Sequence, residues 1–215
     1  MRDKVVVCLP TRNESQSVQY MIDKIKSLGY DLFISDSNSN DGTIEIAKKN
    51  KVPVYQRDGP GKGFGIRKAL QIAKEKGYDV LVLIDCDKTY PVEYIPIMLR
   101  YMPKYDMVVG ARGLEEIKPF HRLPNKAHTI AINLLFGGRL KDINSGLRAF
   151  KVNKFKRFRS KGFDIEAEIT VKALKNKLKI KEIPIKYQKR VGHSKIRIKD
   201  GFLILSRIIK ERFTS

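Results

Sequence analysis

Short apolar runs alternate with longer amphipathic segments through the first half of the chain. The apolar runs are typical of buried strands, which we place at residues 4–10, 30–36, 52–56, 79–85 and 105–112. Between these strands, apolar side chains recur at helical spacing, which predicts helices over residues 14–29, 41–50, 63–77 and 91–102.

The order of these elements indicates the fold class. Strands that alternate with helices form a largely parallel sheet covered by helices on both faces, and ligands bind beyond the carboxyl ends of its strands. The pattern loosens after residue 113, where we expect helices near residues 124–137, 164–177 and 200–213. Neither an internal repeat nor a low-complexity linker interrupts the chain, so we predict a single α/β domain over residues 1–215.

The composition supports a folded protein with a core of its own. Of the 215 residues, 42% are hydrophobic and 9% aromatic, which excludes a disordered chain. A chain of this length needs no disulfide to fold, and Cys8 and Cys86 lie in or beside predicted strands. We therefore expect two free thiols and a reducing, cytoplasmic setting. No apolar stretch approaches the roughly 18 residues that span a bilayer.

The charge is strongly positive and unevenly distributed. Lysine and arginine outnumber aspartate and glutamate by 44 to 23, a net charge of +21. Residues 1–100 contribute only +3 of this charge, whereas residues 151–215 contribute +14. Such a surface attracts phosphorylated substrates, anionic lipid headgroups or nucleic acid. A lysine-rich surface of the kind found in thermophilic proteins would give the same balance.

Two aspartates lie close together against this basic background. In the stretch VLVLIDCDKTYP (residues 80–91), the most apolar strand ends at Asp85 and Asp87. Two carboxylates so close repel each other unless a positive charge lies beside them, and Mg²⁺ characteristically binds one or two carboxylates together with substrate phosphates. This pattern predicts a metal site at the carboxyl edge of the sheet. The alternative is an ordinary strand-ending turn, in which aspartate is common.

Polar residues also follow the neighbouring strands and should lie at the same edge of the sheet. Arg12 and Glu14 come after the first strand, Asp36 ends the second, and Arg112 ends the fifth. The chemistry of the site is therefore expected to combine carboxylates with phosphate-binding cations.

A glycine-rich stretch, GPGKGFG (residues 59–65), precedes the third predicted helix. Its glycines would let the backbone approach a ligand closely, and Lys62 would reach a phosphate. It lacks the ending of a phosphate-binding P-loop and the position of a dinucleotide fingerprint, so it is a weak motif by itself.

Taken together, these motifs resemble the family 2 glycosyltransferases of the GT-A type, and especially the branch of dolichyl-phosphate mannose synthases and polyprenyl-phosphate glucosyltransferases. The resemblance runs from VVVCLPTRNE to YQKRVGHSKI and rests on the order and spacing of the motifs. They are LPTRNE (9–14), SDSNSNDGT (35–43), DCD (85–87), AR (111–112), DINSGLRAF (142–150) and RVGHSK (190–195). The resemblance implies the GT-A fold, a mostly parallel sheet with helices on both faces.

The resemblance also implies roles for individual residues. The ligands of a divalent cation, Mg²⁺ or Mn²⁺, would be Asp85, Asp87 and Thr89. Contacts to a nucleotide sugar are implied for Pro10, Arg12, Glu14, Asp36, Lys62, Asp85, Cys86, Asp87, Arg112, Arg190 and Lys195. Contacts to an acceptor are implied for Ser145, Gly146, Arg148 and Ser194. The residues expected to act in catalysis are Asp87, Asp142 and Arg190.

Two positions depart from the family pattern. Ser37 replaces the second acid that relatives carry after Asp36, which leaves open whether the donor base is uracil or guanine. Thr89 replaces a glutamine that is an additional metal ligand in some relatives. Residues 1–112 would form the nucleotide-binding half and residues 113–215 the acceptor-binding half.

The activity implied by the resemblance is an inverting, metal-dependent transfer of a hexose from a GDP-mannose or UDP-glucose type of donor to a polyprenyl or dolichyl phosphate. A lipid monophosphate is largely a dianion at pH 7, because its second pKa is about 6. It needs placement and charge compensation more than a general base, and Asp142 is the candidate if a base is used. Glu166 and Glu168 would be further acids near the site or ordinary partners of a helix dipole.

A lipid acceptor requires access to a membrane. Residues 201–213 predict an amphipathic helix that would lie in a membrane interface, and residues 129–138 are a second apolar candidate. We therefore expect peripheral attachment to the cytoplasmic face of a membrane. Both segments would otherwise pack on the sheet as ordinary core helices.

Three alternatives remain open at this point. The same fold would serve a soluble phosphorylated or sugar acceptor. A basic nucleic-acid-binding protein is compatible with the charge, but no recognised binding motif supports it, so no specific nucleic acid is expected as a partner. A nucleotidyltransferase would need a basic, glycine-rich fingerprint at the first strand, which LPTRNE does not supply.

Overall fold

The computed structural model describes residues 3–192 and 197–213 and confirms the alternation of strands and helices through residue 112. The strands are β1 (Val5–Thr11), β2 (Asp31–Asp36), β3 (Val54–Gln56), β4 (Val80–Leu83), β5 (Met107–Arg112), β6 (Arg148–Lys151) and β7 (Ile180–Ile185). The helices are α1 (Ser15–Ser27), α2 (Thr43–Lys49), α3 (Lys62–Glu75), α4 (Tyr94–Leu99), α5 (Pro119–Phe136), α6 (Ile165–Lys175) and α7 (Ile198–Phe213).

The strands form one sheet in the order β3-β2-β1-β4-β6-β5-β7, and only β6 runs antiparallel to its neighbours among the strands described. Leu83 of β4 and Val109 of β5 both pair with Arg148, the first residue of β6. Because β6 is reversed, it starts where its neighbours end, so the loop before it enters the carboxyl edge of the sheet. This strand was not predicted, since its four residues, RAFK, form no apolar run.

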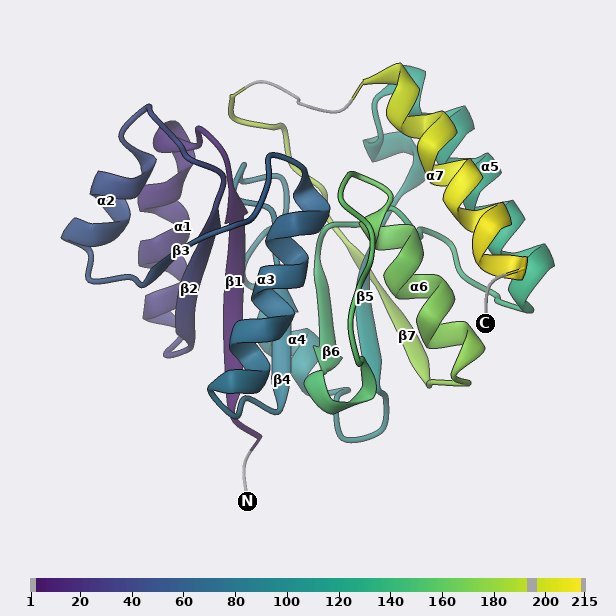
Figure 1. Cartoon of the computed structure of the whole chain (residues 1–215), viewed down its shortest axis with the longest axis horizontal. Coiled ribbons are helices and arrows are strands. Elements are labelled where there is room, and N and C mark those ends of the chain that lie inside the picture. The colour runs from purple at the N-terminus through teal and green to yellow at the C-terminus, as the bar shows by residue number, and fades with distance from the viewer. Residues whose placement is uncertain (1–2, 193–196, 214–215) are drawn as a thin grey trace.

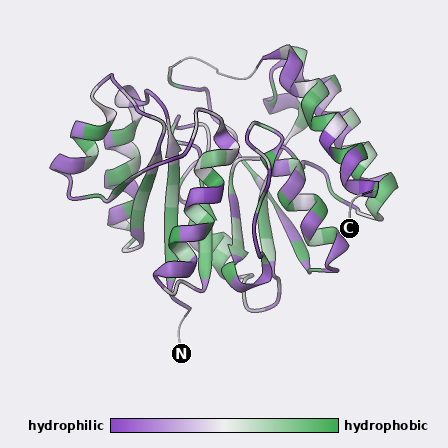
Figure 2. Ribbon diagram, viewed as in Figure 1, coloured by the Kyte–Doolittle hydropathy of each residue, from purple (hydrophilic) through white to green (hydrophobic). Residues whose placement is uncertain are grey.

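Helices cover both faces of the sheet, as predicted (Figure 1). Side chains of α1, α2 and α4 form one core with the sheet, and side chains of α3 and α6 form another on the opposite face. The fully buried residues of α1 include Val18, Met21, Ile22 and Ile25, which have the helical spacing expected of a core-facing stripe. Figure 2 shows the same division, with hydrophobic strands in the middle of the molecule and polar outer surfaces on the helices.

A third group of helices lies at one end of the sheet, where α5 and α7 pack on each other and on α6 (Figure 1). Ile132, Val171, Ile204 and Ile208 are buried between them. One face of each of these two helices is therefore buried, but against neighbouring helices and not on the sheet as the alternative had it. In the part of the chain that the structure describes, no helix has both the length and the hydropathy needed to cross a bilayer.

Two helix boundaries differ from the prediction. Helix α5 starts at Pro119 rather than near residue 124, because proline fits the first helical position, where no amide donor is needed. Helix α4 covers only Tyr94–Leu99 of the predicted residues 91–102, and turns extend it at both ends.

Candidate active site

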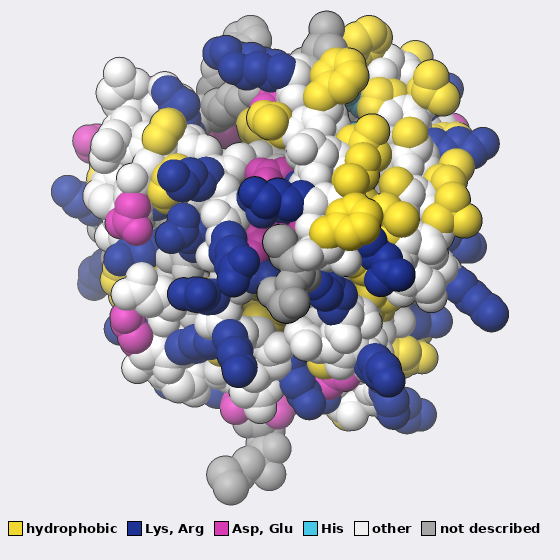
Figure 3. Space-filling model, turned by 45° about the vertical axis from the view of Figure 1, so that its right-hand side comes forward, with side chains coloured by type: hydrophobic (Ala, Val, Ile, Leu, Met, Phe, Trp, Pro, Cys, Tyr) yellow, Lys and Arg dark blue, Asp and Glu magenta, His cyan; other side chains and the backbone are white. Residues whose placement is uncertain are grey.

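A cavity of about 1030 Å³ opens at the carboxyl edge of the sheet. Charged side chains line one end of it, where the strands stop: Glu14, Lys62, Asp85, Asp87, Arg112 and Arg190. Apolar side chains of α5 and α7 line the other end: Phe120, Leu123, Pro124, Phe202, Ile204 and Leu205. Figure 3 shows hydrophobic side chains gathered over the α5–α7 end, beside a hollow where acidic and basic side chains meet.

Lys62 lies between two carboxylates at the charged end of the cavity. Its Nζ atom is 2.6 Å from Asp85 Oδ1 and 2.6 Å from Glu166 Oε1. Burial alone would lower the pKa of Lys62, but the two carboxylates more than offset it and hold the pKa above its ordinary value. Lys62 is therefore a fixed positive charge, as predicted for a phosphate contact, and Glu166 proves to be an acid of the site.

Asp87 is held by contacts on both of its oxygens. Thr89 donates to Oδ1 from its amide at 3.1 Å and its hydroxyl at 2.5 Å, and Arg190 Nη1 lies 2.5 Å from Oδ2. Arg190 also reaches Glu14 at 3.5 Å, so the motif near residue 190 meets the motif after β1. Asp87 lies in the turn that follows β4, as the alternative interpretation of this stretch had it, but it is only 3% exposed.

Thr89 supports Asp87 from beneath. It is 1% exposed, its hydroxyl is taken by Asp87, and it does not line the cavity. This position does not favour the predicted role of Thr89 as a metal ligand, which stays a prediction.

Arg112 and Asp142 form a two-pronged ion pair. Arg112 Nε and Nη2 donate to the two oxygens of Asp142 at 2.6 and 2.9 Å. Burial alone would raise the pKa of Asp142, but the hydrogen bonds and charge of Arg112 hold it below its ordinary value. Asp142 is 1% exposed and lies behind Arg112, so it orients this cation and is unsuited to the predicted role of general base.

The predicted acceptor contacts in the loop before β6 and at its first residue are not among the residues that line the cavity. Ser145 donates its hydroxyl to the carbonyl of Gly110, and Arg148, 1% exposed, donates to Ser145 O, Ile143 O and Thr170 Oγ1. These donors are used within the fold, which favours a supporting role for Ser145 and Arg148. Their predicted contacts to an acceptor stay a prediction.

Gly146 is the third predicted acceptor contact, and it has a steric role. A Cβ at this position would collide with the carboxylate of Asp85. Its amide donates to the hydroxyl of Tyr90 at 2.8 Å. A larger residue at this position would displace the Asp85 carboxylate, so the glycine lets the loop lie close to it.

The remaining predicted nucleotide contacts separate into two groups. Pro10, Arg12 and Cys86 line the cavity. Asp36 does not, because it is fully buried and both its oxygens accept hydrogen bonds, from the hydroxyl of Thr11 and from the amide and hydroxyl of Ser39. It fixes the strand ends and is not positioned to contact a base directly. Ser194 and Lys195 lie outside the described residues.

The glycine-rich stretch before α3 also packs within the protein. A Cβ on Gly61 or Gly63 would collide with the backbone carbonyls of Lys161 and Ser160, and the amide of Gly63 donates to the carbonyl of Gly162 at 3.1 Å. Gly61 and Gly63 let the start of α3 approach the 160–162 loop, and this places Lys62 in the cavity, which Gly61 also lines.

Several residues at the site were not predicted. Arg57 follows β3, and Tyr187, Asn144 and His128 line the cavity. The ring of Tyr187 packs edge-on against Tyr90 and carries the Arg112 guanidinium 5.3 Å from its centre. The strand-end rule that selected Arg12 would also have selected Arg57. No sequence signal identified the other three.

The surroundings of Asp85 and Asp87 bear on whether these residues can hold a metal ion. Among the residues that the structure describes, no three His, Cys, Asp or Glu side chains are grouped to hold a metal by themselves. Asp85 and Asp87 both line the cavity, the Asp85 side chain is 26% exposed, and positive groups already lie against each. These residues fit a hard cation that takes its remaining ligands from a bound diphosphate.

Comparison with known proteins connects this geometry to named enzymes. The chain is 29% identical over 201 residues to a dolichyl-phosphate hexose transferase of Haloferax volcanii, covering 90% of this chain and 87% of the relative. It is 27% identical over 216 residues to an undecaprenyl-phosphate mannosyltransferase of Micrococcus luteus, again covering 90% and 87%.

The fold has close matches among solved structures. Glucosyl-3-phosphoglycerate synthase of Mycobacterium tuberculosis, solved with Mn²⁺, UDP and glucosyl-3-phosphoglycerate, superposes with a TM-score of 0.78 over 99% of this chain and 81% of that one. At 18% identity this likeness shows the fold, which is the GT-A fold. The model of the glycosyl transferase family 2 matches residues 6–183. With the strand-end carboxylates and cations in place, this match shows that the chain is a glycosyltransferase and belongs to family 2.

Proposed function

We propose that this enzyme transfers a hexose from a nucleoside diphosphate sugar to a polyprenyl phosphate, with inversion at the sugar. One observation carries the proposal: a single cavity joins the charged cluster at the strand ends to an apolar surface between α5 and α7. The names of the relatives from Haloferax volcanii and Micrococcus luteus support the same acceptor class.

The apolar end of the cavity suits a lipid chain. Phe120, Leu123 and Phe202 are 67%, 77% and 72% exposed, although large apolar side chains gain free energy when they leave water. Lys118 and Lys199 line the same part of the cavity. A polyprenyl phosphate has the matching chemistry, because its isoprenoid chain would cover the apolar surface while its phosphate meets cations.

The charged end suits a diphosphate leaving group. A divalent cation, Mg²⁺ or Mn²⁺, bound by Asp85 and Asp87 would neutralise the diphosphate oxygens. Lys62, Arg112 and Arg190 are fixed cations that compensate the charge developing there.

In the proposed reaction, an oxygen of the acceptor phosphate attacks the anomeric carbon of the sugar from the face opposite the diphosphate. A carbon–oxygen bond forms to the acceptor, the bond to the diphosphate breaks, and the nucleoside diphosphate leaves with the bonding electrons. The acceptor is already ionised at pH 7, so the reaction requires no general base. This agrees with the burial of Asp142 behind Arg112.

The same arrangement leads us to propose peripheral attachment to the cytoplasmic face of a membrane. The exposed side chains of α5 and α7 would enter the interface, and the net charge of +21 would favour anionic headgroups.

The test is an assay with radiolabelled nucleotide sugars, a divalent cation and polyprenyl phosphate, followed by extraction into organic solvent. We expect label in the organic phase only when the lipid is present. Label that stays in the aqueous phase with a soluble phosphorylated acceptor would instead support the alternative acceptor class. Binding of nucleic acid that falls steeply with salt would reflect net charge only.

A further inference from the structure

The segment between β6 and α6 carries a run of positive charges without an acid. Residues 154–161 read KFKRFRSK, so five of these eight residues are lysine or arginine, and all five are exposed. The two phenylalanines among them, Phe155 and Phe158, are 2% and 4% exposed and pack against Phe150 in the core. We call residues 154–161 the basic loop. Its buried rings fix the loop to the protein, so its basic side chains project together into solvent.

Little within the protein neutralises this loop. Lys154 lies 3.9 Å from Asp106, at the end of the loop far from the active site. Within residues 3–192 and 197–213, no ion pair is formed by Lys156, Arg157 or Arg159. Like charges gathered without acids repel one another, and such a surface attracts an anionic partner.

The neighbouring helices add lysines to the loop. Lys74 of α3 donates from Nζ to the carbonyl of Lys156 at 2.6 Å, and Lys172 of α6 donates to the carbonyl of Arg157, also at 2.6 Å. The acid that pairs with Lys172, Glu168, is fully buried, so it adds no negative charge to the outer surface. The basic surface therefore extends from the loop onto α3 and α6, between which the loop runs in Figure 1.

The opposite face of the sheet has a different charge pattern. Its helices α1 and α2 also carry lysines, but Asp23 and Glu45 are interspersed among them. Lys24 of α1 lies 3.9 Å from Glu93. A high net charge alone would give both faces the same character, so the acid-free loop is a local feature.

The basic loop ends beside the active-site cavity and the apolar surface of α5 and α7. Gly162 and Phe163, which follow the loop, line the cavity. The next residue, Asp164, accepts from Arg207 of α7 at 2.8 Å. Figure 3 shows basic side chains beside the hydrophobic surface, on the one side of the molecule that this view faces. A broad partner on this side would therefore meet basic and apolar groups together.

An anionic bilayer offers both matching chemistries. Its headgroups attract lysine and arginine, and its acyl boundary accepts exposed apolar side chains such as Phe202, which is 72% exposed. Duplex nucleic acid would use the charges but leave the apolar surface in water. Single-stranded nucleic acid stacks its bases on exposed aromatic rings, whereas the rings of the basic loop are buried. The observations therefore favour lipid over nucleic acid.

We propose, resting on the function proposed above, that the basic loop and the apolar surface of α5 and α7 form one membrane-contact surface, in which the loop binds anionic headgroups. The cavity then opens toward the bilayer, and α1 and α2 face away from it. In this orientation a polyprenyl phosphate reaches the cations of the site without leaving the interface.

The test is co-sedimentation with vesicles of phosphatidylglycerol and phosphatidylcholine. A triple variant removes three charges of the basic loop: Lys156→Gln, Arg157→Gln and Arg159→Gln. The matched control removes three exposed charges in and after α2: Lys48→Gln, Lys49→Gln and Lys51→Gln. Both proteins have the same net charge. We expect the partition coefficient to fall by about tenfold to a hundredfold in the loop variant and by less than about threefold in the control.

Two further measurements separate membrane contact from catalysis. Sugar transfer to polyprenyl phosphate in non-ionic detergent should be unchanged in the loop variant, whereas transfer in anionic vesicles should fall. A charge-retaining variant should bind vesicles like the parent: Lys156→Arg, Arg157→Lys and Arg159→Lys. Circular dichroism would verify folding, and if the triple variant does not fold, each single glutamine variant should still weaken vesicle binding by about threefold.

Equal weakening in the loop variant and the control would overturn the proposal, because net charge alone would then account for binding. Unchanged vesicle binding by the loop variant would overturn it as well, and so would loss of duplex DNA binding at physiological salt while vesicle binding persisted. Vesicle binding that depends on the loop, without sugar transfer to lipid in vesicles or detergent, would reject the proposed function and keep the membrane surface. Transfer in detergent with no loop dependence in vesicles would do the reverse.

Discussion

The two ends of the active-site cavity are built in opposite ways. At the charged end, Lys62, Arg112 and Arg190 each lie against a carboxylate, and two of those acids, Asp87 and Asp142, are at most 3% exposed. At the apolar end, large side chains of α5 and α7 remain mostly exposed. One end is thus complete within the protein, whereas nothing in the described part of the chain covers the other.

The difference follows from the cost of each kind of group. A buried charge is tolerated only when a partner and hydrogen bonds compensate it, so the cations and acids must be placed together by the fold. An exposed apolar side chain costs less free energy, about 25 cal/mol for each Å² left in water. Such a surface can therefore remain uncovered until a lipid binds. Under the proposed function, the charged end would position the reaction and the apolar end would receive the acceptor.

The largest expected effect is on the charged end. Asp85→Asn removes one negative charge from the cation site, and sugar transfer should fall about a thousandfold, or about 4 kcal/mol. The fold should survive, because Lys62 keeps Glu166 as its partner and the Asp85 side chain is 26% exposed. Steady-state kinetics with Mn²⁺ or Mg²⁺ measures the effect. The exposed Asp23→Asn is the control, and near-normal turnover of Asp85→Asn would disprove the site.

The next largest effect is expected at Arg148, a buried residue whose hydrogen bonds hold the loop before β6. Arg148→Met deprives two backbone carbonyls and Thr170 of their donor in a fully buried place, which should cost about 3 kcal/mol of unfolding free energy. Urea denaturation measures it. The exposed Arg139→Met should change the free energy by less than about 0.5 kcal/mol. A similarly small change for Arg148→Met would show that this arginine is not structural.

The apolar end is tested by a double variant, Leu123→Ser with Phe202→Ser. Transfer to polyprenyl phosphate in anionic vesicles should fall by about tenfold, because two exposed anchors are lost. Binding of the nucleotide at the charged end should not change. Vesicle co-sedimentation should also weaken, and high salt should release the parent protein. Ile97→Ser, on α4 and 40% exposed, is the matched control; an equal loss there would contradict a specific lipid surface.

The smallest effect concerns the junction of the two ends. His128 of α5 accepts from the Asn144 side chain at Nδ1 and donates from Nε2 to the carbonyl of Gly201 in α7, at 3.0 and 2.9 Å. Burial lowers the pKa of His128, although the Gly201 carbonyl opposes this, so the neutral form is favoured in the folded state. As the pH falls below the ordinary value of about 6.5, the unfolded chain takes up the proton more readily.

The stability contributed by neutral His128 is therefore present above about pH 6.5 and is lost as the pH falls through the lower, folded-state pKa. The melting temperature should drop by a few degrees more in the parent than in His128→Gln between about pH 7.5 and pH 5.5. Thermal denaturation at both pH values measures the difference. Identical pH dependence in the two proteins would count against this junction.

The first half of the fold and the location of the site follow from local sequence pattern. The spacing of hydrophobic residues and the positions where strands end are short-range properties of the sequence. From them, the strands through Arg112 were predicted correctly, and Asp85 and Asp87 were predicted at the carboxyl edge of the sheet, where they line the cavity. The start of α5 differs from the prediction because Pro119 begins the helix. The ends of α4 differ because the spacing of apolar residues does not distinguish the flanking turns from helix.

The role of each residue depended on neighbours far apart in the chain. Asp142 was expected to act on an acceptor, but it pairs with Arg112, 30 residues earlier, and Glu168 holds the amides of Arg159 and Ser160 instead of facing the site. Arg148 became structural because β6 runs backwards between β4 and β5. Neither the direction of a short strand nor the partner of a buried charge is encoded in local periodicity.

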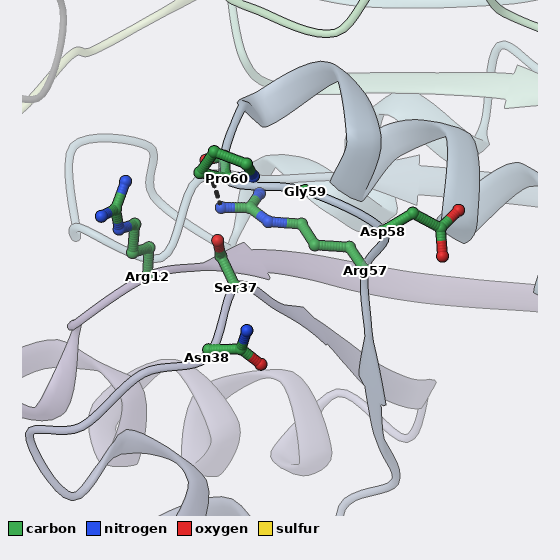
Figure 4. A pocket seen from close by; sticks show the side chains of 7 residues that line it. All are labelled: Arg12, Ser37, Asn38, Arg57, Asp58, Gly59 and Pro60. Atoms are coloured by element: carbon green, nitrogen blue, oxygen red, sulfur yellow. Dashed lines mark hydrogen bonds between the residues drawn. The ribbon is translucent and has the colours of Figure 1, made fainter.

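By itself, the sequence determined the alternating α/β architecture, the motifs of the family and the strand ends at which its chemistry would lie. The tertiary structure decided which polar groups face the cavity and which form hydrogen bonds that support it. It also placed Arg57 between the cavity and a second, smaller pocket, which Arg12 and Ser37 also line (Figure 4). The physical reason is that the spacing of apolar side chains sets helix or strand within a few residues. The pairing of charges and hydrogen bonds depends instead on segments that meet only when the sheet is assembled.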